Sequence, residues 1–295
     1  MANLKEVRTR ISSVSSTQQI TSAMKMVSAA KFRRAQNAII GMRPYASQLG
    51  EIVADIDTGG ELLTPYHAKR PLCNVLLVVI TSNKGLCGAF NSNVIKQAQQ
   101  RIDHFRSVLP ADGQLHVLSI GKKSSEALAR QKDLILTVHD ELLDAPTFDA
   151  IASIADDIME KFSAKQFDHV EVVYNVFKNS LTQILTTEQW LPVAPKSLNG
   201  SKDIKESKVN DYIYEPSKEE IVRGMVPLTL RSTFYRMILD SQASEHGARM
   251  NAMQQATDNA TELLKDLRLS YNKARQAAIT NEIIEIVSGS EALKG

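Results

Sequence analysis

The chain has 295 residues, of which 43% are hydrophobic, 23% charged and only 5% aromatic. Few aromatic residues and many alanine, glutamine, serine and charged residues favour long helices over one large globular core. No uninterrupted run of 18 apolar residues occurs, so no membrane-spanning helix is expected. The N-terminus has no hydrophobic signal core, so we expect a cytoplasmic, unprocessed chain. Cys73 and Cys87 are too few for a disulfide framework or a zinc site.

The net charge of +2 hides an asymmetry along the chain. Residues 1–43 contain eight basic residues and one acidic residue, which gives +7 there and leaves −5 for the remainder. A basic helical segment is typical of proteins that bind an acidic partner, which can be nucleic acid, anionic lipid or an acidic protein surface. A solvated helix face explains the same charges without any partner.

Residues 3–57 predict a long N-terminal helix. Its apolar residues begin with the 3-4 spacing of a coiled-coil seam, at Leu4, Val7, Ile11 and Val14. From there the apolar residues drift away from that spacing, which predicts a straighter or irregularly wound helix. Pro44 is expected to interrupt or kink the helix. The heptad positions after residue 14 are Gln18, Thr21, Lys25 and Ser28, whereas the apolar residues stand at Ile20, Met24 and Val27.

Residues 72–195 predict an α/β domain. Strands are expected at 74–82, 116–121, 133–138, 168–177 and 183–190, and helices at 89–105, 122–131 and 147–162. Strands that alternate with helices indicate a doubly wound, mainly parallel sheet, which is a Rossmann-like domain. Residues 192–210 are polar and predict a loop.

Residues 208–295 predict a C-terminal helical segment. Ser217 and Glu220 form a capping box that opens a short helix to about Met225, and Pro227 kinks or restarts it. Residues 228–288 contain one glycine, Gly247, and no proline, which favours a continuous helix. Such a helix would be roughly 90 Å long, too long for a compact domain of this size. It needs a partner along its length. We therefore predict an antiparallel coiled coil between this segment and residues 1–60. Apolar or small residues recur at helical spacing at Leu230, Phe234, Met237, Ser241, Ala248, Ala252, Ala256, Ala260, Leu263, Leu267, Tyr271, Ala274 and Ala278.

No motif predicts a catalytic residue, a metal site or a cofactor. The turn Gly85-x-x-Gly88 stands between a strand and a helix, where nucleotide-binding folds hold phosphate, but it matches neither common phosphate-binding motif. A tight turn is its favoured interpretation. The six histidines have no ligand spacing. The cluster Ala23, Met24 and Met26 predicts helix core.

Several stretches resemble the gamma subunit of F-type ATP synthases. They are LKEVRTRISSVSSTQQITSAMKMVSAAKFRRAQ from Leu4, SNKGLCGAFNSN from Ser82, YIYEP from Tyr212, ARMNAMQQATDNA from Ala248 and YNKARQAAITNEIIEIVSG from Tyr271. The resemblance spans essentially the whole chain in the same order. The last stretch is similar to the family pattern I-T-x-E-x-x-E-x-x-x-G-A, with Ser290 in place of the final alanine. Without a thiol-bearing insertion or a transit peptide, the resemblance implies a bacterial member.

The resemblance implies a rotating central-stalk shaft and not a catalytic subunit. Its implied partners are the ring of alpha and beta subunits, the epsilon subunit and the membrane c-ring, without nucleic acid. The chain would be peripheral to the cytoplasmic face of the bacterial plasma membrane and couple ion flow to ATP synthesis or hydrolysis. The implied beta-subunit contacts are Met24, Lys25, Arg249, Arg275, Gln276 and Thr280, and the implied contacts with the rotor ring and epsilon are Tyr212 and Glu215.

Two other functions remain open from the residues alone. A nucleotide-dependent enzyme could be built on the central domain around the glycine turn. A scaffold or nucleic-acid-binding coiled coil could use the basic N-terminal helix, although that helix lacks the interleaved aromatic residues typical of such surfaces.

Overall fold

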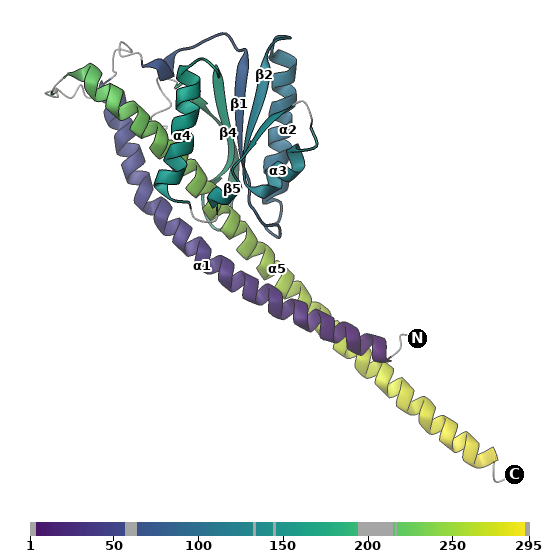
Figure 1. Ribbon diagram of the computed structural model, residues 1–295. Coiled ribbons are helices and arrows are strands. Elements are labelled where there is room, and N and C mark those ends of the chain that lie inside the picture. The colour runs from purple at the N-terminus through teal and green to yellow at the C-terminus, as the bar shows by residue number, and fades with distance from the viewer. Residues whose placement is uncertain are drawn as a thin grey trace. The chain divides into compact units, whose positions relative to one another are not determined.

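The computed structural model describes residues 4–56, 64–131, 134–143, 146–193, 215 and 217–292 (Figure 1). These residues form two compact units, one of Met1–Ser28 with Arg249–Gly295 and one of Ala29–Ala248. The two long helices, α1 and α5, contribute residues to both units. The helices are α1 (Leu4–Ile56), α2 (Phe90–Val108), α3 (Lys122–Leu128), α4 (Phe148–Ser163) and α5 (Lys218–Ala292), and the strands are β1 (Asn74–Ile80), β2 (Gln114–Ile120), β3 (Ile135–Val138), β4 (His169–Phe177) and β5 (Gln183–Leu191).

The larger unit contains a five-stranded sheet in the order β3-β2-β1-β4-β5. The first four strands are parallel, as predicted, and Val75 of β1 aligns with Leu115 of β2 and with His169 of β4. Strand β5 pairs antiparallel to β4. The physical reason is the connection between them, residues 178–182, which is far too short for the crossover that a parallel pair requires. The predicted fold class of paired long helices with a mainly parallel, doubly wound α/β domain is confirmed.

Each face of this sheet carries its own hydrophobic core, because successive side chains of a strand point to opposite faces. On one face, Val75, Leu77 and Val79 of β1 pack in a cluster with residues of α2 and α3. On the other face, Leu76, Val78 and Ile80 pack in a cluster with residues of α4 and α5 (Figure 1). The α5 residues in this second core are Val222, Val226, Leu230, Phe234, Met237 and Ile238.

Both long helices continue through their internal prolines, so neither Pro44 nor Pro227 interrupts its helix, and the alternative of a kink at these residues stays a prediction. Helix α5 begins at Lys218, where the Ser217 hydroxyl accepts a hydrogen bond from Glu220 N at 3.3 Å, as the capping box predicts. It then runs as one helix past Pro227. A proline inside a helix costs about 3 kcal/mol. The burial of Val222, Val226 and Leu230 around it provides the tertiary packing that offsets this cost.

Gly247 lies where α5 passes close to other parts of the larger unit. A Cβ atom at this position would lie 3.3 Å from the Ser180 carbonyl oxygen and 3.4 Å from the Phe32 ring. Nearby, Phe32 meets Phe177 edge-on at 5.5 Å between ring centroids. The glycine inside the predicted long helix therefore marks a close approach between α1, α5 and the β4–β5 turn.

In the smaller unit, α1 and α5 run antiparallel. Gln18 Nε2 donates to Thr261 Oγ1 at 2.7 Å, and Thr257 Oγ1 donates to Thr21 Oγ1 at 2.8 Å. Residue numbers rise along one helix as they fall along the other, which is the signature of antiparallel pairing. The predicted coiled coil is present over this stretch.

The contact seam of α1 in this unit keeps the heptad positions and does not follow the drifting apolar residues, and the predicted straighter or irregular winding stays a prediction. Thr21 and Ser28 are buried, whereas Ile20 and Val27 are 60% and 58% exposed. On α5 the seam passes through Met253, Ala260 and Leu264, and the predicted Leu263 is 41% exposed. The 3-4 spacing is therefore maintained by small and polar side chains.

Candidate functional site: the paired helices and the free end of α5

The paired helices of the smaller unit are held by a polar contact. The two inter-helix hydrogen bonds, Gln18 to Thr261 and Thr257 to Thr21, connect to a further bond within each helix. Thr21 Oγ1 donates to Gln18 O at 3.0 Å, and Thr261 Oγ1 donates to Thr257 O at 2.8 Å. Four side chains thus form one connected set, which we call the Gln18–Thr261 network. Few large apolar residues are buried around it, so little hydrophobic free energy holds this pair of helices together.

The C-terminal end of α5 extends past the start of α1. Thr21 faces Thr257, so Leu4, which lies 17 residues earlier in α1, falls opposite about residue 274 of α5. The described side chains from Arg275 to Glu291 are all exposed. This end of α5 has no part of the described α1 beside it, and we call residues 275–291 the free end of α5.

The free end of α5 is amphipathic although nothing covers it. Ile279, Ile283, Ile284, Ile286 and Val287 are between 49% and 67% exposed. At roughly 100° per residue these five side chains fall within roughly 160° of the helix circumference. The acidic Glu285 lies on the opposite side, and Glu282 lies about 40° beyond the edge of the stripe. An exposed one-sided apolar stripe is the surface of a helix that contacts a partner through that side.

The residues that the sequence places at a beta-subunit contact fall into two groups. Arg275, Gln276 and Thr280 are exposed on the free end, and the last two lie within its apolar stripe. The others belong to the paired part of the smaller unit. Among them Met24 and Lys25 are half-buried, and Arg249 is 8% exposed. Of the pair expected near the rotor ring, Glu215 is exposed and Tyr212 lies outside the described residues.

The structure also shows surface residues that the sequence analysis missed. Met26 is 66% exposed and Ala23 is exposed, so their assignment to a helix core is wrong. With Val27 at 58% exposure, Met26 forms an apolar surface on the outer side of α1. The heptad positions predict this outward orientation once Thr21 and Ser28 are accepted as seam residues.

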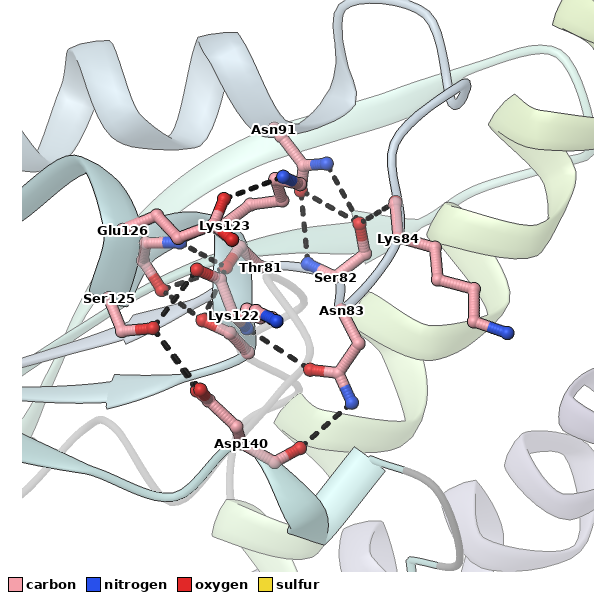
Figure 2. A network of polar contacts seen from close by, with 12 residues as sticks. Thr81, Ser82, Asn83, Lys84, Asn91, Lys122, Lys123, Ser125, Glu126 and Asp140 are labelled. Atoms are coloured by element: carbon pink, nitrogen blue, oxygen red, sulfur yellow. Dashed lines mark hydrogen bonds and ion pairs between the residues drawn. The ribbon is translucent and has the colours of Figure 1, made fainter.

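The carboxyl edge of the sheet, in the larger unit, contains the glycine turn that suggested nucleotide binding. Figure 2 shows the side chains that gather there from the ends of β1, β2 and β3. Their amides and hydroxyls bond to one another and to backbone groups. Asn83 joins two of the loops, because its Nδ2 donates to Asp140 O at 2.8 Å and its Oδ1 accepts from Lys122 N at 3.1 Å.

Three backbone N–H groups at this edge, next to the glycine turn, already have partners within the chain. At the start of α3, Ser124 N donates to Thr81 Oγ1 at 3.0 Å and Lys123 N donates to Ser82 O at 3.2 Å. Before α2, Ser82 N donates to Asn91 Oδ1 at 3.0 Å. A phosphate would have to displace these side chains. The geometry therefore favours a structural turn over a nucleotide site.

Comparison with known proteins agrees with the architecture. A family model described as ATP synthase matches residues 3–293. The ATP synthase gamma chain of Flavobacterium johnsoniae is 54% identical over 297 residues, which cover the whole of both chains. The chain belongs to the ATP synthase gamma chain family. The ATP synthase gamma chain of Cytophaga hutchinsonii is 47% identical over 298 residues, with 99% of both chains covered.

Solved structures of ATP synthases show the same fold as this gamma chain family member. A chain from the central stalk and c-ring of the Tetrahymena thermophila mitochondrial ATP synthase is 27% identical, with a TM-score of 0.60, and the match covers 80% of this chain and 99% of that chain. A chain of the Euglena gracilis enzyme is 21% identical with a TM-score of 0.63 and 98% and 94% coverage, which shows the fold alone. Family membership makes this chain a subunit of an ATP synthase. No helix in the described ranges is long and apolar enough to cross a bilayer.

Proposed function

We propose that this chain is the rotating central-stalk shaft of an ATP synthase, coupling ion flow through the membrane rotor to ATP synthesis and hydrolysis on other subunits. The family match over residues 3–293 supports the place in the complex. The observation that carries the shaft function is the free end of α5, whose apolar stripe has no partner in the described chain. An α-helix of 75 residues spans about 110 Å, which suits a mechanical element.

The one-sided stripe supplies the asymmetry that such a shaft needs. In a ring of equivalent catalytic subunits, a helix with one apolar side contacts one subunit differently from the others. A differential contact free energy of a few kcal/mol is enough to shift a subunit between two conformations. Rotation of the helix then moves this bias from one subunit to the next. The chain itself supplies no catalytic group, and catalysis takes place on the beta subunits.

The contacts follow from the same proposal. Arg275, Gln276 and Thr280 meet a beta subunit along the free end, and Met24, Lys25 and Arg249 lie at a second beta contact lower on the paired helices. The basic α1 would then find its acidic partner on beta. Tyr212 and Glu215 belong to the contact with the c-ring and the epsilon subunit. The complex holds the chain at the cytoplasmic face of a bacterial plasma membrane.

Reconstitution of the complex with and without this chain tests the proposal. The alpha and beta subunits should hydrolyse ATP slowly without it. ATP synthesis driven by an ion gradient should require the full-length chain. Gradient-driven synthesis at the normal rate in a complex that lacks the chain would refute the shaft function.

A matched pair of variants tests the site on the free end. Gln276→Leu should lower coupled synthesis while leaving the melting temperature of the chain nearly unchanged, because the side chain is exposed and lies in the stripe. Glu285→Gln, which is also exposed but lies on the opposite side, should leave both unchanged. Equal loss of coupling in the two variants would mean that the stripe is not the contact surface.

A further inference from the structure

We propose that the Gln18–Thr261 network sets the axial register of α1 against α5 in the smaller unit. The network is composed of Gln18 and Thr21 on α1 and of Thr257 and Thr261 on α5. Its two inter-helix bonds, at 2.7 and 2.8 Å, join the helices at neighbouring turns. This assignment goes beyond the proposed function, and it rests on that function only for its effect on coupling.

A register device is useful because few apolar residues of this contact are buried. The buried apolar side chains of the smaller unit, within its described residues, are Val7, Met253, Ala260 and Leu264. These are widely spaced, Met253 is flexible and Ala260 is small, and the other apolar seam residues are only half-buried. An antiparallel pair with a weakly specified apolar seam can slip by one turn, since each turn presents a similar surface. Thr21 and Ser28 occupy the seam positions where a regular coiled coil has large apolar residues.

The spacing of the four side chains permits both bonds in only one register. The two residues on α1 are three apart, and the two on α5 are four apart. A slip of one turn in one direction would place Thr21 opposite Thr261, and in the other direction Gln18 opposite Thr257. Either slip keeps at most one inter-helix bond. A polar contact at the seam of a helix pair fixes register in this way, at some expense in stability. Here the Thr257–Thr21 bond is half-buried, and the Gln18–Thr261 bond beside it is exposed.

The two acceptor side chains of the network are positioned by their own helices, whereas the Thr257 hydroxyl shares its one proton between Thr21 Oγ1 at 2.8 Å and Met253 O at 2.7 Å. The Thr21 hydroxyl donates to Gln18 O, and the Thr261 hydroxyl donates to Thr257 O. These bonds orient the oxygen lone pairs toward the other helix. The acceptor oxygens of both inter-helix bonds are therefore preorganised, and one or both bonds are lost on slipping. The expected preference for the observed register over a slipped one is about 5- to 30-fold.

Distances between spin labels on the full-length chain test the register directly. The two native cysteines are first removed by Cys73→Ser and Cys87→Ser, and the labels are attached at Arg10→Cys and Glu282→Cys. In the observed register these two sites are separated along the helix axis by about 14 residues, or ~21 Å. This offset makes a slip of one turn change their distance by about 5 Å. The parent should give one distance population. The fourfold variant Gln18→Leu, Thr21→Val, Thr257→Val and Thr261→Val should add a second population whose distance is shifted by that amount. The ratio of this slipped population to the parental one should be about 5- to 30-fold higher than in the parent.

The control is Thr9→Val with Thr17→Val. Both hydroxyls are exposed and donate only within α1, to Lys5 O at 2.9 Å and to Ser13 O at 3.0 Å. This control should keep the single parental distance. An unchanged single distance in the fourfold variant overturns the assignment. If that variant loses its helical circular dichroism, Thr21→Val with Thr257→Val decides by the same criterion.

Coupled ATP synthesis in the reconstituted complex separates this inference from the proposed function. If the network sets register in a working shaft, the fourfold variant should show the second distance and reduced coupling. A second distance with unaltered coupling would support the register role and contradict the shaft function. Reduced coupling with a single distance would contradict the register role alone.

Discussion

A series of glycine substitutions tests how the larger unit is packed, and Gly121 is its most sensitive member. Gly121 follows β2 with φ at +111°, a conformation that side-chain-bearing residues rarely adopt. A Cβ atom there would lie 2.5 Å from the Thr81 carbonyl oxygen and 2.9 Å from Thr81 Oγ1. The neighbouring atoms belong to backbone and to a bonded hydroxyl, so they cannot move aside cheaply.

The expected effect of Gly121→Ala is a loss of about 3 kcal/mol in the free energy of unfolding. The backbone conformation contributes about 1–3 kcal/mol of strain. Displacement of Thr81 also weakens its bonds to Gly121 O and Ser124 N, at 3.3 and 3.0 Å, each worth about 1 kcal/mol. For a unit of this size, 1 kcal/mol corresponds to about 2–4 °C in melting temperature. We therefore expect a decrease of about 6–12 °C.

Two glycines in α5 serve as matched controls in the same measurement. Gly224 has no atom within 4 Å of a built Cβ, so Gly224→Ala should stabilise the helix by up to about 1 kcal/mol. At Gly247 the same helical gain is opposed by the 3.3 Å approach of Ser180 O, so Gly247→Ala should be nearly neutral. Urea unfolding followed by circular dichroism gives all three values. The packing argument fails if Gly121→Ala is within about 0.5 kcal/mol of the parent.

Three further predictions concern charge and surface. Asp240→Ala should lower the free energy of unfolding by about 2 kcal/mol, because the carboxylate is buried and bonds Arg43 at 3.0 Å. Asp156→Ala removes a half-exposed ion pair and should lower it by at most about 1 kcal/mol. Equal losses for the two variants in urea unfolding would contradict this. Burial raises the pKa of Glu171, but the hydrogen bonds from His169 and Arg101 outweigh burial and hold this pKa below the usual 4.5. Its carboxylate therefore contributes stability above pH 4.5 that is lost as pH falls through the lower folded pKa, and Glu171→Gln should flatten that acid decline in urea titrations; an unchanged slope would exclude this role. Ile283→Ser should reduce coupled synthesis at an unchanged melting temperature, since the side chain is 55% exposed; a lowered melting temperature with full coupling would contradict it.

The sequence was most informative where one local pattern determines one element. The run Asn74–Ile80 is β-branched and apolar, and it forms the buried central strand β1. The capping residue Ser217 marks the true start of α5. The antiparallel orientation of β5 was missed although the predicted strands already left a connection of residues 178–182, because the alternation of strands and helices was applied to the last strand pair, which has no helix between its strands.

Both helices continue through their prolines for a common physical reason. A local rule assigns Pro44 and Pro227 a cost that is correct for an isolated helix. It does not include the burial of residues on both sides, such as Ile39 and Val53 around Pro44. Tertiary packing outweighs the local preference in both helices. The division of the chain into residues 1–60, 72–195 and 208–295 remains a prediction.

The polar side chains at the carboxyl edge of the sheet could not be predicted from sequence. Asn83, Lys122 and Asp140 come from the ends of three strands, and only the parallel strand order brings them together (Figure 2). The sequence favoured a tight turn at Gly85 but left nucleotide binding open, because a sequence does not show which N–H groups near the turn already have acceptors. At Ser124 N the acceptor is Thr81 Oγ1, which lies 43 residues away in the chain.

The smaller unit separates two requirements that a rotating shaft places on one helix. Along the paired part of α5, small and polar seam residues hold α1 with few buried apolar groups, so its register depends on directional hydrogen bonds. Along the free end, apolar residues lie exposed on one side, where no hydrogen bond fixes them to a single position. Hydrogen bonds are directional, whereas apolar contact is not. Directional bonds therefore lie where the two helices must stay in register, and non-directional contact lies where a surface must be able to leave one partner and meet the next.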